Sequence, residues 1–408
     1  MNGFRVIWQL LGESDYRRIW ITGLCSGVSR WLEVLAVGVY AFEVTGSPFL
    51  VAFVFVIRMA PLMIFGSVIG ALADRSTPRR YMIAAMVLGL AASAVVCVLL
   101  LIGLANYWVA AGTATVFGLV WSVDMTLRRR MLGDLAGKER LVTALSFESA
   151  SNNSTRMLGP LLGGVLYHSI GPVGAFGLML ILYAIALFML VRTHPGDTSK
   201  TQIAAPTRIM ADLREAFSLA VNDRDIFRIL LVTAVFNVWA FPFMSMIPVI
   251  GAERLHLNPT WIGVLASMEG MGALFGALVI AIANPSIGLR RLYFFGTVAF
   301  MAFAFIAGFI TIPVLMAIAI LCVGLSASGF SAMQSTLIYS VAPPNMRSRL
   351  FGLVVICIGT GLIGTANMGL MAEWVGAATA IRIVAVEGLI AMAAIGFGWR
   401  ELWNRQHA

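Results

Sequence analysis

Two residues of opposite charge, Arg30 and Glu33, lie three positions apart inside an apolar run near the start of the chain. On a helix this spacing places both side chains on one face, where they can pair. A charge at the centre of a membrane helix costs about 2.5–3.5 kcal/mol on insertion scales, so charged residues kept there mark candidate functional sites. Glu33 is therefore a candidate proton or cation site. The alternative is a static ion pair with Arg30.

A second set of polar residues recurs at every fourth position of a later apolar run: Glu148, Asn152 and Arg156. Such spacing forms one polar stripe along a helix. The stripe either binds and gates a substrate or holds helices together through buried hydrogen bonds.

Four further positions carry charge inside apolar runs. Arg58 is a candidate contact for Glu33 or for the substrate, and Glu269 is a second candidate proton carrier. Arg382 and Glu387 lie in the last apolar run, and the sequence offers no functional interpretation of them.

The elements that must hold these residues are membrane helices. The chain has 408 residues, of which 60% are hydrophobic and only 12% charged, with a mean hydropathy of +0.91. Continuous apolar runs of about 20 residues match the thickness of a bilayer, and helices satisfy the backbone hydrogen bonds that lipid cannot. The sequence predicts twelve spans, at 19–41, 49–72, 81–102, 107–127, 142–167, 174–191, 227–250, 260–283, 292–311, 314–340, 350–372 and 378–398.

The positive charges are arranged along the chain in a way that predicts its orientation. Nearly all Lys and Arg residues outside the spans lie in alternate connections, and the opposite connections hold only Arg254. The positive-inside rule then places both termini on the cytoplasmic side of the membrane. The net charge of +9 is explained by this topology and does not indicate nucleic acid. The predicted organisation is a first bundle at 1–191, a linker with an amphipathic helix at 192–226 and a second bundle at 227–408.

Two motifs carry a family resemblance. Gly70-x-Leu-Ala-Asp74-Arg75, followed by Arg79-Arg80, resembles the signature between helices two and three of the major facilitator superfamily. Gly159-Pro160-Leu-Leu-Gly163-Gly164 resembles the end of its antiporter motif. Shorter matches resemble the bacterial exporter branch that includes enterobactin exporters and macrolide efflux proteins: Glu43-Val-Thr-Gly-Ser-Pro48, Arg58-x-x-Pro61, Asp124-x-x-x-Arg128 and Asn153-x-x-Arg156-x-x-Gly159. The chain departs from the signature at Thr77-Pro78, where glycine is usual.

The resemblance implies an all-α polytopic fold of twelve helices in two pseudo-symmetric six-helix bundles. It also implies roles for three sets of residues. The gate comprises Gly70, Asp74, Arg75, Asp124 and Arg128; Asp74 is expected to dock at the start of span eleven and Arg75 to pair with Asp124, unless the motif only orients its loop. Gly159, Pro160, Gly163 and Gly164 are expected to form a conformational hinge. The aromatic or weakly polar residues of the cavity are expected to be Trp31, Trp121, Asn237, Trp239 and Phe241, with ordinary packing as the alternative.

The predicted function is proton-coupled efflux of a small apolar or amphipathic compound, such as a drug or siderophore, by alternating access. A lysophospholipid or other lipid-like substrate, or uptake of a metabolite, is the alternative within transport. A sensor or scaffold that keeps the fold without turnover is the alternative of another class. No enzymatic activity, cofactor, metal or nucleic acid is expected, and the expected partners are the substrate, protons and the lipid bilayer around a monomer.

Overall fold

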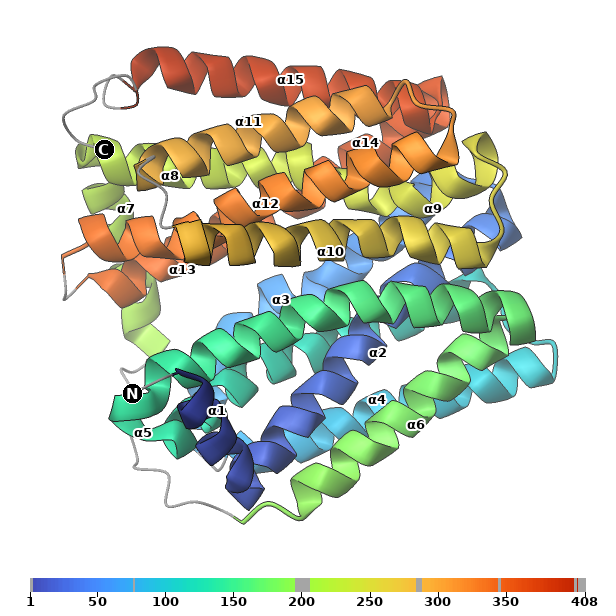
Figure 1. The fold of residues 1–408 in the computed structure, drawn as a ribbon, viewed down its shortest axis with the longest axis horizontal. Helices are drawn as coiled ribbons and strands as arrows, with labels where there is room; N and C mark the ends of the chain where they lie inside the picture. Colours follow the sequence, from blue (N-terminus) through green and yellow to red (C-terminus); the bar gives the residue numbers. More distant parts are fainter. Residues whose placement is uncertain are drawn as a thin grey trace. The chain divides into compact units, whose positions relative to one another are not determined.

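The computed structural model describes residues 3–75, 78–194, 206–283, 288–343, 346–399 and 402. All regular elements in these ranges are helices (Figure 1). Before the linker they are α1 (Gly3–Gly12), α2 (Ser14–Thr45), α3 (Pro48–Arg75), α4 (Pro78–Leu101), α5 (Tyr107–Ile170) and α6 (Pro172–Val191). After it come α7 (Pro206–Asn222), α8 (Arg224–Val235), η1 (Phe236–Ala240), η2 (Phe241–Met246), α9 (Ile247–Val249), η3 (Ile250–Arg254), α10 (Pro259–Ala283), α11 (Leu289–Ala307), α12 (Pro313–Val341), α13 (Arg347–Gly359), α14 (Gly361–Val375) and α15 (Ala377–Gly398).

The predicted all-α polytopic fold is confirmed. Within the described ranges, ten helices are long and apolar enough to cross a membrane, and Pro48–Ile64 is a shorter apolar helix. The predicted spans four and five both lie in α5, which is interrupted only at Gly137. Gly137 has φ 70° and ψ 167°, a conformation that glycine adopts without the steric cost of a side chain. The part of α5 after Gly137 carries the polar stripe of Glu148, Asn152 and Arg156 and is not among the ten.

The chain forms two compact units. Unit 1 comprises Met1–Gly46, Ile57–Ile203 and Leu257–Ser267, and unit 2 comprises Ser47–Val56, Ala204–His256 and Met268–Ala408. The first residues of α3 thus belong to unit 2 and the first residues of α10 to unit 1. The boundaries predicted from the sequence, at 191 and 227, assign α3 to the first bundle and α10 to the second.

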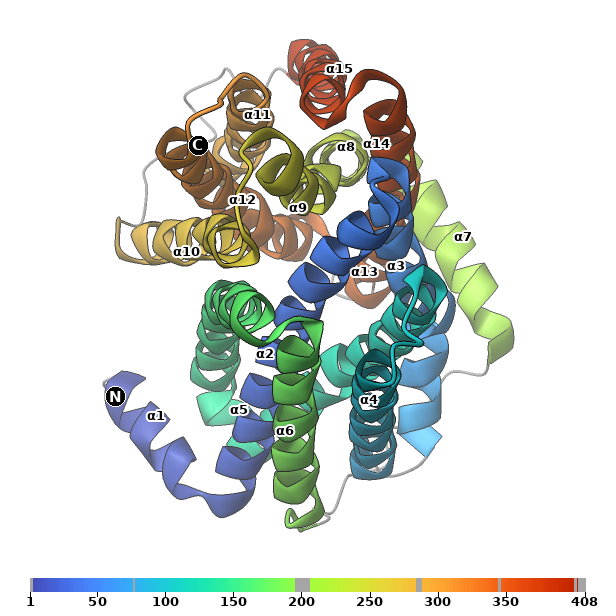
Figure 2. The same cartoon turned by 90° about the vertical axis from the view of Figure 1, so that its right-hand side faces the viewer.

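Unit 1 is built around α2, which packs along both α5 and α6 (Figure 2). The short helix α1 is amphipathic, and its apolar face packs on α2 and α5. Val6 and Leu10 of α1 are buried there against Tyr16, Ile19 and Leu132. Trp8, on the other face of α1, is largely exposed.

Unit 2 has α11 side by side with α12 and with α15 (Figure 1). Its core is aromatic: Phe236 stacks on Phe330 with ring centroids 3.7 Å apart, and Tyr293 stacks on Phe330 at 5.3 Å. The predicted span seven is irregular, because π-helical and 3₁₀ turns replace the α-helix over η1, η2 and η3. Such interruptions within membrane helices often mark functional hinges.

Arginines at corresponding places in the two halves bond the last carbonyls of the last helix in each half. Arg18 donates to the carbonyl oxygen of Arg192, just beyond α6, at 2.6 Å. Arg79 donates to the carbonyl oxygen of Val191, the last residue of α6, also at 2.6 Å. In the second half Arg228 donates to Gly398 O at 2.5 Å and Arg291 donates to Leu402 O at 2.7 Å, beyond α15. Cationic side chains suit helix C-termini, whose carbonyls lack helical partners. The two halves therefore share this way of capping their last helix.

Candidate functional site

The buried charges of unit 1 form two ion-pair groups. In the first, Arg58 of α3 donates from Nε to Glu33 Oε2 of α2 at 2.7 Å. The two side chains are only 4% and 1% exposed. The sequence left open whether Glu33 pairs with Arg30 or with Arg58, and the structure pairs it with Arg58.

Arg30 is bonded elsewhere. Its Nη2 donates to Asn152 Oδ1 of the α5 stripe at 2.5 Å. Its guanidinium carbon lies 5.1 Å from the ring centroid of Trp31 and 5.4 Å from that of Trp121. Arg30 therefore joins α2 to α5 through the amide of Asn152 and the indole ring of Trp121, while Trp31 is its neighbour in α2.

Two further arginines complete this arrangement. The Arg58 guanidinium lies 5.3 Å from the Trp121 ring, and the Arg156 guanidinium lies 4.9 Å from the Trp31 ring. We call Arg30, Trp31, Arg58, Trp121 and Arg156 the Arg–Trp cluster. Desolvated cation–π contacts are worth about 2 kcal/mol each, so the indoles stabilise guanidinium groups in a region poor in water.

The second ion-pair group centres on Arg128 of α5. Its guanidinium donates to Asp124 Oδ1 at 3.0 Å and to Glu148 Oε1 at 2.8 Å. Arg129 also contacts Glu148, with its Nε 3.3 Å from Oε2. Asp124, Arg128 and Glu148 are all buried. Arg128 therefore balances two carboxylates and ties the two parts of α5 together on either side of Gly137.

A small cavity lies between the two ion-pair groups. Arg30, Arg58, Trp121 and Asp124 line it together with Ser26, Phe117, Val120 and Tyr183. Its volume of about 10 Å³ is the size needed for a single water molecule. It can hold no organic substrate in this conformation.

Of the five predicted gate residues, only Asp124 and Arg128 have side chains that the structure describes. Side chains 65–75 lie outside the described part of the structure, so the predicted docking of Asp74 and pairing of Arg75, and the surroundings of Gly70, are not described. Asp124 and Arg128, assigned to the same gate, bond each other.

The predicted hinge motif is a place of close helix packing. A Cβ atom at Gly159 would lie 2.6 Å from Trp31 Cβ, and one at Gly163 would lie 3.1 Å from Leu32 Cγ, so both glycines let α5 approach α2. A Cβ atom at Gly164 would lie 2.5 Å from the carbonyl oxygen of Pro259, in the first turn of α10. α5 continues as a helix through Pro160. Small residues at these positions therefore permit backbone contact, as in other membrane helix pairs.

The candidate residues of unit 2 are more dispersed. Glu269 is completely buried in α10. Asn237 donates to Thr233 O at 2.8 Å within its own helix. Trp239 Nε1 donates to Glu387 Oε2 at 3.1 Å, which gives Glu387 of α15 a structural partner. Phe241 opens the 3₁₀ turn η2.

Arg382, which had no interpretation from the sequence, holds the end of unit 2 together. Its Nη2 donates to Thr379 Oγ1 at 2.8 Å, and its guanidinium lies 4.7 Å from the Phe309 ring. Thr379 lies three residues before Arg382 in α15, whereas Phe309 is brought close by the fold and no sequence pattern signals that contact.

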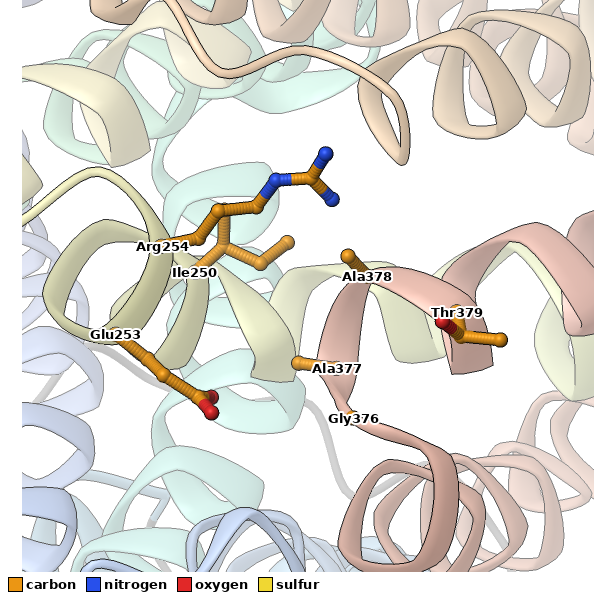
Figure 3. A pocket seen from close by; sticks show the side chains of 7 residues that line it. All are labelled: Ile250, Glu253, Arg254, Gly376, Ala377, Ala378 and Thr379. Atoms are coloured by element: carbon orange, nitrogen blue, oxygen red, sulfur yellow. The ribbon is translucent and has the colours of Figure 1, made fainter.

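A larger pocket lies beside these residues, where η3 meets the start of α15 (Figure 3). It has a volume of about 250 Å³. Glu253 and Arg254 line it and point in different directions (Figure 3). Arg254 already donates to Gly308 O at 2.7 Å and Phe309 O at 3.1 Å. The Arg254 side chain therefore caps the end of α11.

Comparisons with known proteins agree with this fold and extend the resemblance. Similar solved structures include a peptide transporter POT in complex with sulfate (12% identity, TM-score 0.77, 94% of both chains) and the nucleoside transporter NupG (13% identity, TM-score 0.72, 93% of this chain and 98% of that one). At such identities they support the fold alone. Among sequences, the staphyloferrin A transporter of Staphylococcus aureus is 22% identical over 336 residues, 81% of this chain and 82% of that protein. Macrolide efflux protein A of Streptococcus pyogenes is 20% identical over 382 residues, 90% and 91% of the two chains.

The family model described as transmembrane secretion effector matches residues 7–401, nearly the whole chain. With the apolar helices, this makes the protein an integral membrane protein, and it confirms the resemblance to bacterial drug and siderophore exporters. The chain belongs to the transmembrane secretion effector family of major facilitator transporters.

Proposed function

We propose that this transporter exports a small amphipathic compound from the cytoplasm by alternating access, driven by proton entry. The family match and the efflux relatives support the direction of transport. The compounds after which these two relatives are named, staphyloferrin A and macrolides, support a drug-like or siderophore-like cargo. The concentration of basic residues in alternate connections supports cytoplasmic termini in the bacterial inner membrane.

The observation that carries the proton-coupling proposal is the buried Glu33–Arg58 pair. A carboxylate at 1% exposure is tolerated because Arg58 supplies an opposite charge and a charge-assisted hydrogen bond. When Glu33 takes up a proton, the pair loses its Coulomb attraction and Arg58 becomes available to another acceptor. One proton can in this way change the balance between two conformations of α2 and α3, since a ligand shifts an equilibrium by its differential affinity.

The test is transport in proteoliposomes that contain only the purified protein. Radiolabelled macrolide and staphyloferrin A are offered under an imposed pH gradient, with and without a protonophore. Coupling predicts gradient-driven accumulation of at least one compound and its loss when the protonophore is added. Accumulation that is insensitive to the protonophore contradicts proton coupling. Binding without any flux supports the sensor or scaffold alternative instead.

A further inference from the structure

We propose that α1 and α7 are membrane-surface helices, each with one apolar stripe on the protein and a second in the lipid, and that they bind acidic phospholipid there. The partner is a negatively charged lipid surface, and not a soluble protein or a second copy of this chain. The inference depends neither on the direction of transport nor on proton coupling.

The apolar arc of α1 is wider than the face that the protein covers. Val6 and Leu10 are buried against α2 and α5. Ile7 and Leu11 lie beside them on the helix and are partly exposed. Trp8 lies on the side opposite Val6 and Leu10 and is 72% exposed. A helix that faced water there would carry polar residues, whereas tryptophan is typical of the boundary between lipid headgroups and acyl chains.

The helix α7 shows the same arrangement in unit 2. The structure describes its side chains from Arg214 onward. Ala216 and Ala220 are buried, and α7 packs on α13 and α8. Phe217 and Val221 each follow one of these alanines and form a neighbouring apolar stripe, 61% and 54% exposed. A helix in each unit thus exposes an apolar stripe next to the one that the protein covers.

The chain itself keeps both helices close to a bilayer. One residue, Glu13, separates α1 from α2, and one residue, Asp223, separates α7 from α8. The helical stretches Ser14–Thr45 and Arg224–Arg254, which follow directly, are long and apolar enough to span a membrane. A single residue advances the chain by at most about 3.6 Å, so neither helix can move far from the end of its span. Lipid is therefore the surface within reach of both stripes.

The exposed charge on these helices is positive. The acidic side chains described on them, and on the residues that join them to α2 and α8, are bonded within the protein: Glu13 to Arg140 at 2.6 Å, Glu215 to Arg349, and Asp223 to the backbone N–H groups of Asp225 and Ile226. Arg5 of α1 and Arg214 of α7 are exposed and, in the described part of the chain, belong to none of these pairs. Basic residues beside an apolar stripe favour a membrane surface that contains acidic lipid.

The test measures the surroundings of single positions in the full-length protein in phosphatidylcholine nanodiscs. Trp8→Cys or Phe217→Cys is labelled with bimane in a chain whose four native cysteines are replaced by alanine. The matched controls are Gln9→Cys and Ser218→Cys, which are exposed on the polar sides of the same helices. Phosphatidylcholine brominated in its acyl chains should quench bimane more strongly at positions 8 and 217 than at the controls. Acrylamide, which is dissolved in the water, should show the reverse order.

The preference for acidic lipid is measured with the same label at position 8. Brominated phosphatidylglycerol, as a minor component of the nanodisc, should quench more strongly than brominated phosphatidylcholine at the same content. Arg5→Gln should lower this preference by about fivefold, the loss of one basic residue at a membrane surface. Arg382→Gln removes an arginine of α15 that is bonded to Thr379 and should leave the preference unchanged.

Three outcomes would overturn the proposal. Quenching at position 8 or 217 that matches the controls would place that stripe in water. Weak quenching by both lipid and acrylamide would show that protein covers it, as in a dimer. Equal quenching by the two brominated lipids would exclude a site for acidic phospholipid. If the cysteine-free chain does not fold, the native cysteines are kept and the signal of identically labelled wild-type protein is subtracted.

Discussion

The Glu33–Arg58 pair should behave as a strongly coupled unit when its two residues are replaced by leucine singly and together. Glu33→Leu leaves the Arg58 guanidinium buried at 4% side-chain exposure, and Arg58→Leu leaves the Glu33 carboxylate buried at 1%. Breaking a buried pair from either side costs about 3–5 kcal/mol of unfolding free energy, because the charge that remains is uncompensated. We therefore expect the unfolding free energy of each single variant to be about 3–5 kcal/mol lower than that of the wild type.

The double variant should be far closer to the wild type. Replacing both partners of a buried pair by apolar residues is often neutral or stabilising. Here the double variant also loses the Arg58–Trp121 contact at 5.3 Å, which is worth about 2 kcal/mol when desolvated. The net loss should therefore be about 0–2 kcal/mol, and the two substitutions should be strongly non-additive.

The assay is reversible unfolding by sodium dodecyl sulfate in mixed micelles, followed by circular dichroism. A matched cycle on Arg140 and Glu13, an ion pair 2.6 Å apart whose side chains are 28% and 43% exposed, should give a coupling energy below about 1 kcal/mol. If the double Leu variant loses as much unfolding free energy as the two single variants together, Glu33 and Arg58 are not energetically coupled. It would mean that the two charges are solvated or separately compensated.

Three further predictions concern stability in the same assay. Arg128→Gln leaves the buried Asp124 without its ion-pair partner and Glu148 with only the half-exposed Arg129, and should cost about 3–5 kcal/mol; a loss below about 1 kcal/mol would show that water reaches this group. Arg79→Ala removes the bonds to the end of α6 and should cost about 1–2 kcal/mol, whereas the exposed Arg80→Ala should change little. Equal effects would contradict a specific cap. Gly164→Ala forces α5 away from the backbone of α10 and should cost about 1–3 kcal/mol, while Gly112→Ala, which meets open space, should be neutral or stabilising. A neutral Gly164→Ala variant would show that the close approach is dispensable.

The helices were predictable because the membrane imposes length and composition. The predicted span at 19–41 lies within α2 (Ser14–Thr45), and the predicted span at 378–398 matches α15 (Ala377–Gly398) within a residue at its start. The continuity of α5 through the connection at 128–141 was not predicted, because the charges there indicated a loop. In the sequence, Gly137 was a local signal for this break in α5. The irregular turns of η1 and η2 depend on packing, and hydropathy does not register them.

The buried charges of the candidate site stood out in the sequence by residue type, but the sequence left their pairing open. Intramembrane charges are rare, so Arg30, Glu33, Arg58 and Arg156 stood out in the sequence. Helical spacing favoured Arg30 as the partner of Glu33, but the crossing of α2 and α3 brings Arg58 closer. Contacts between helices depend on rotation and crossing angle, which one sequence does not encode locally.

The role of tryptophan was also underestimated. Trp31 and Trp121 were expected to line a cavity for an apolar ligand. In the structure both rings lie against guanidinium groups. The signal that could have revealed this is the adjacency of Arg30 and Trp31 in the sequence, because neighbours on α2 share the same depth in the membrane.

Proton coupling through Glu33 is tested most directly by comparing two modes of transport in proteoliposomes that contain the Glu33→Gln variant. Glutamine can still accept a hydrogen bond from Arg58 but cannot exchange a proton at neutral pH. Because the variant leaves the buried Arg58 charge uncompensated, circular dichroism of the reconstituted protein must first show that it is folded. Glu387→Gln is the matched control, because Glu387 is also an intramembrane glutamate and its partner is Trp239. If Glu33 carries the coupled proton, Glu33→Gln keeps substrate exchange across the bilayer and loses accumulation driven by a pH gradient, while Glu387→Gln keeps both. Gradient-driven accumulation at the wild-type level by Glu33→Gln would contradict proton coupling through Glu33.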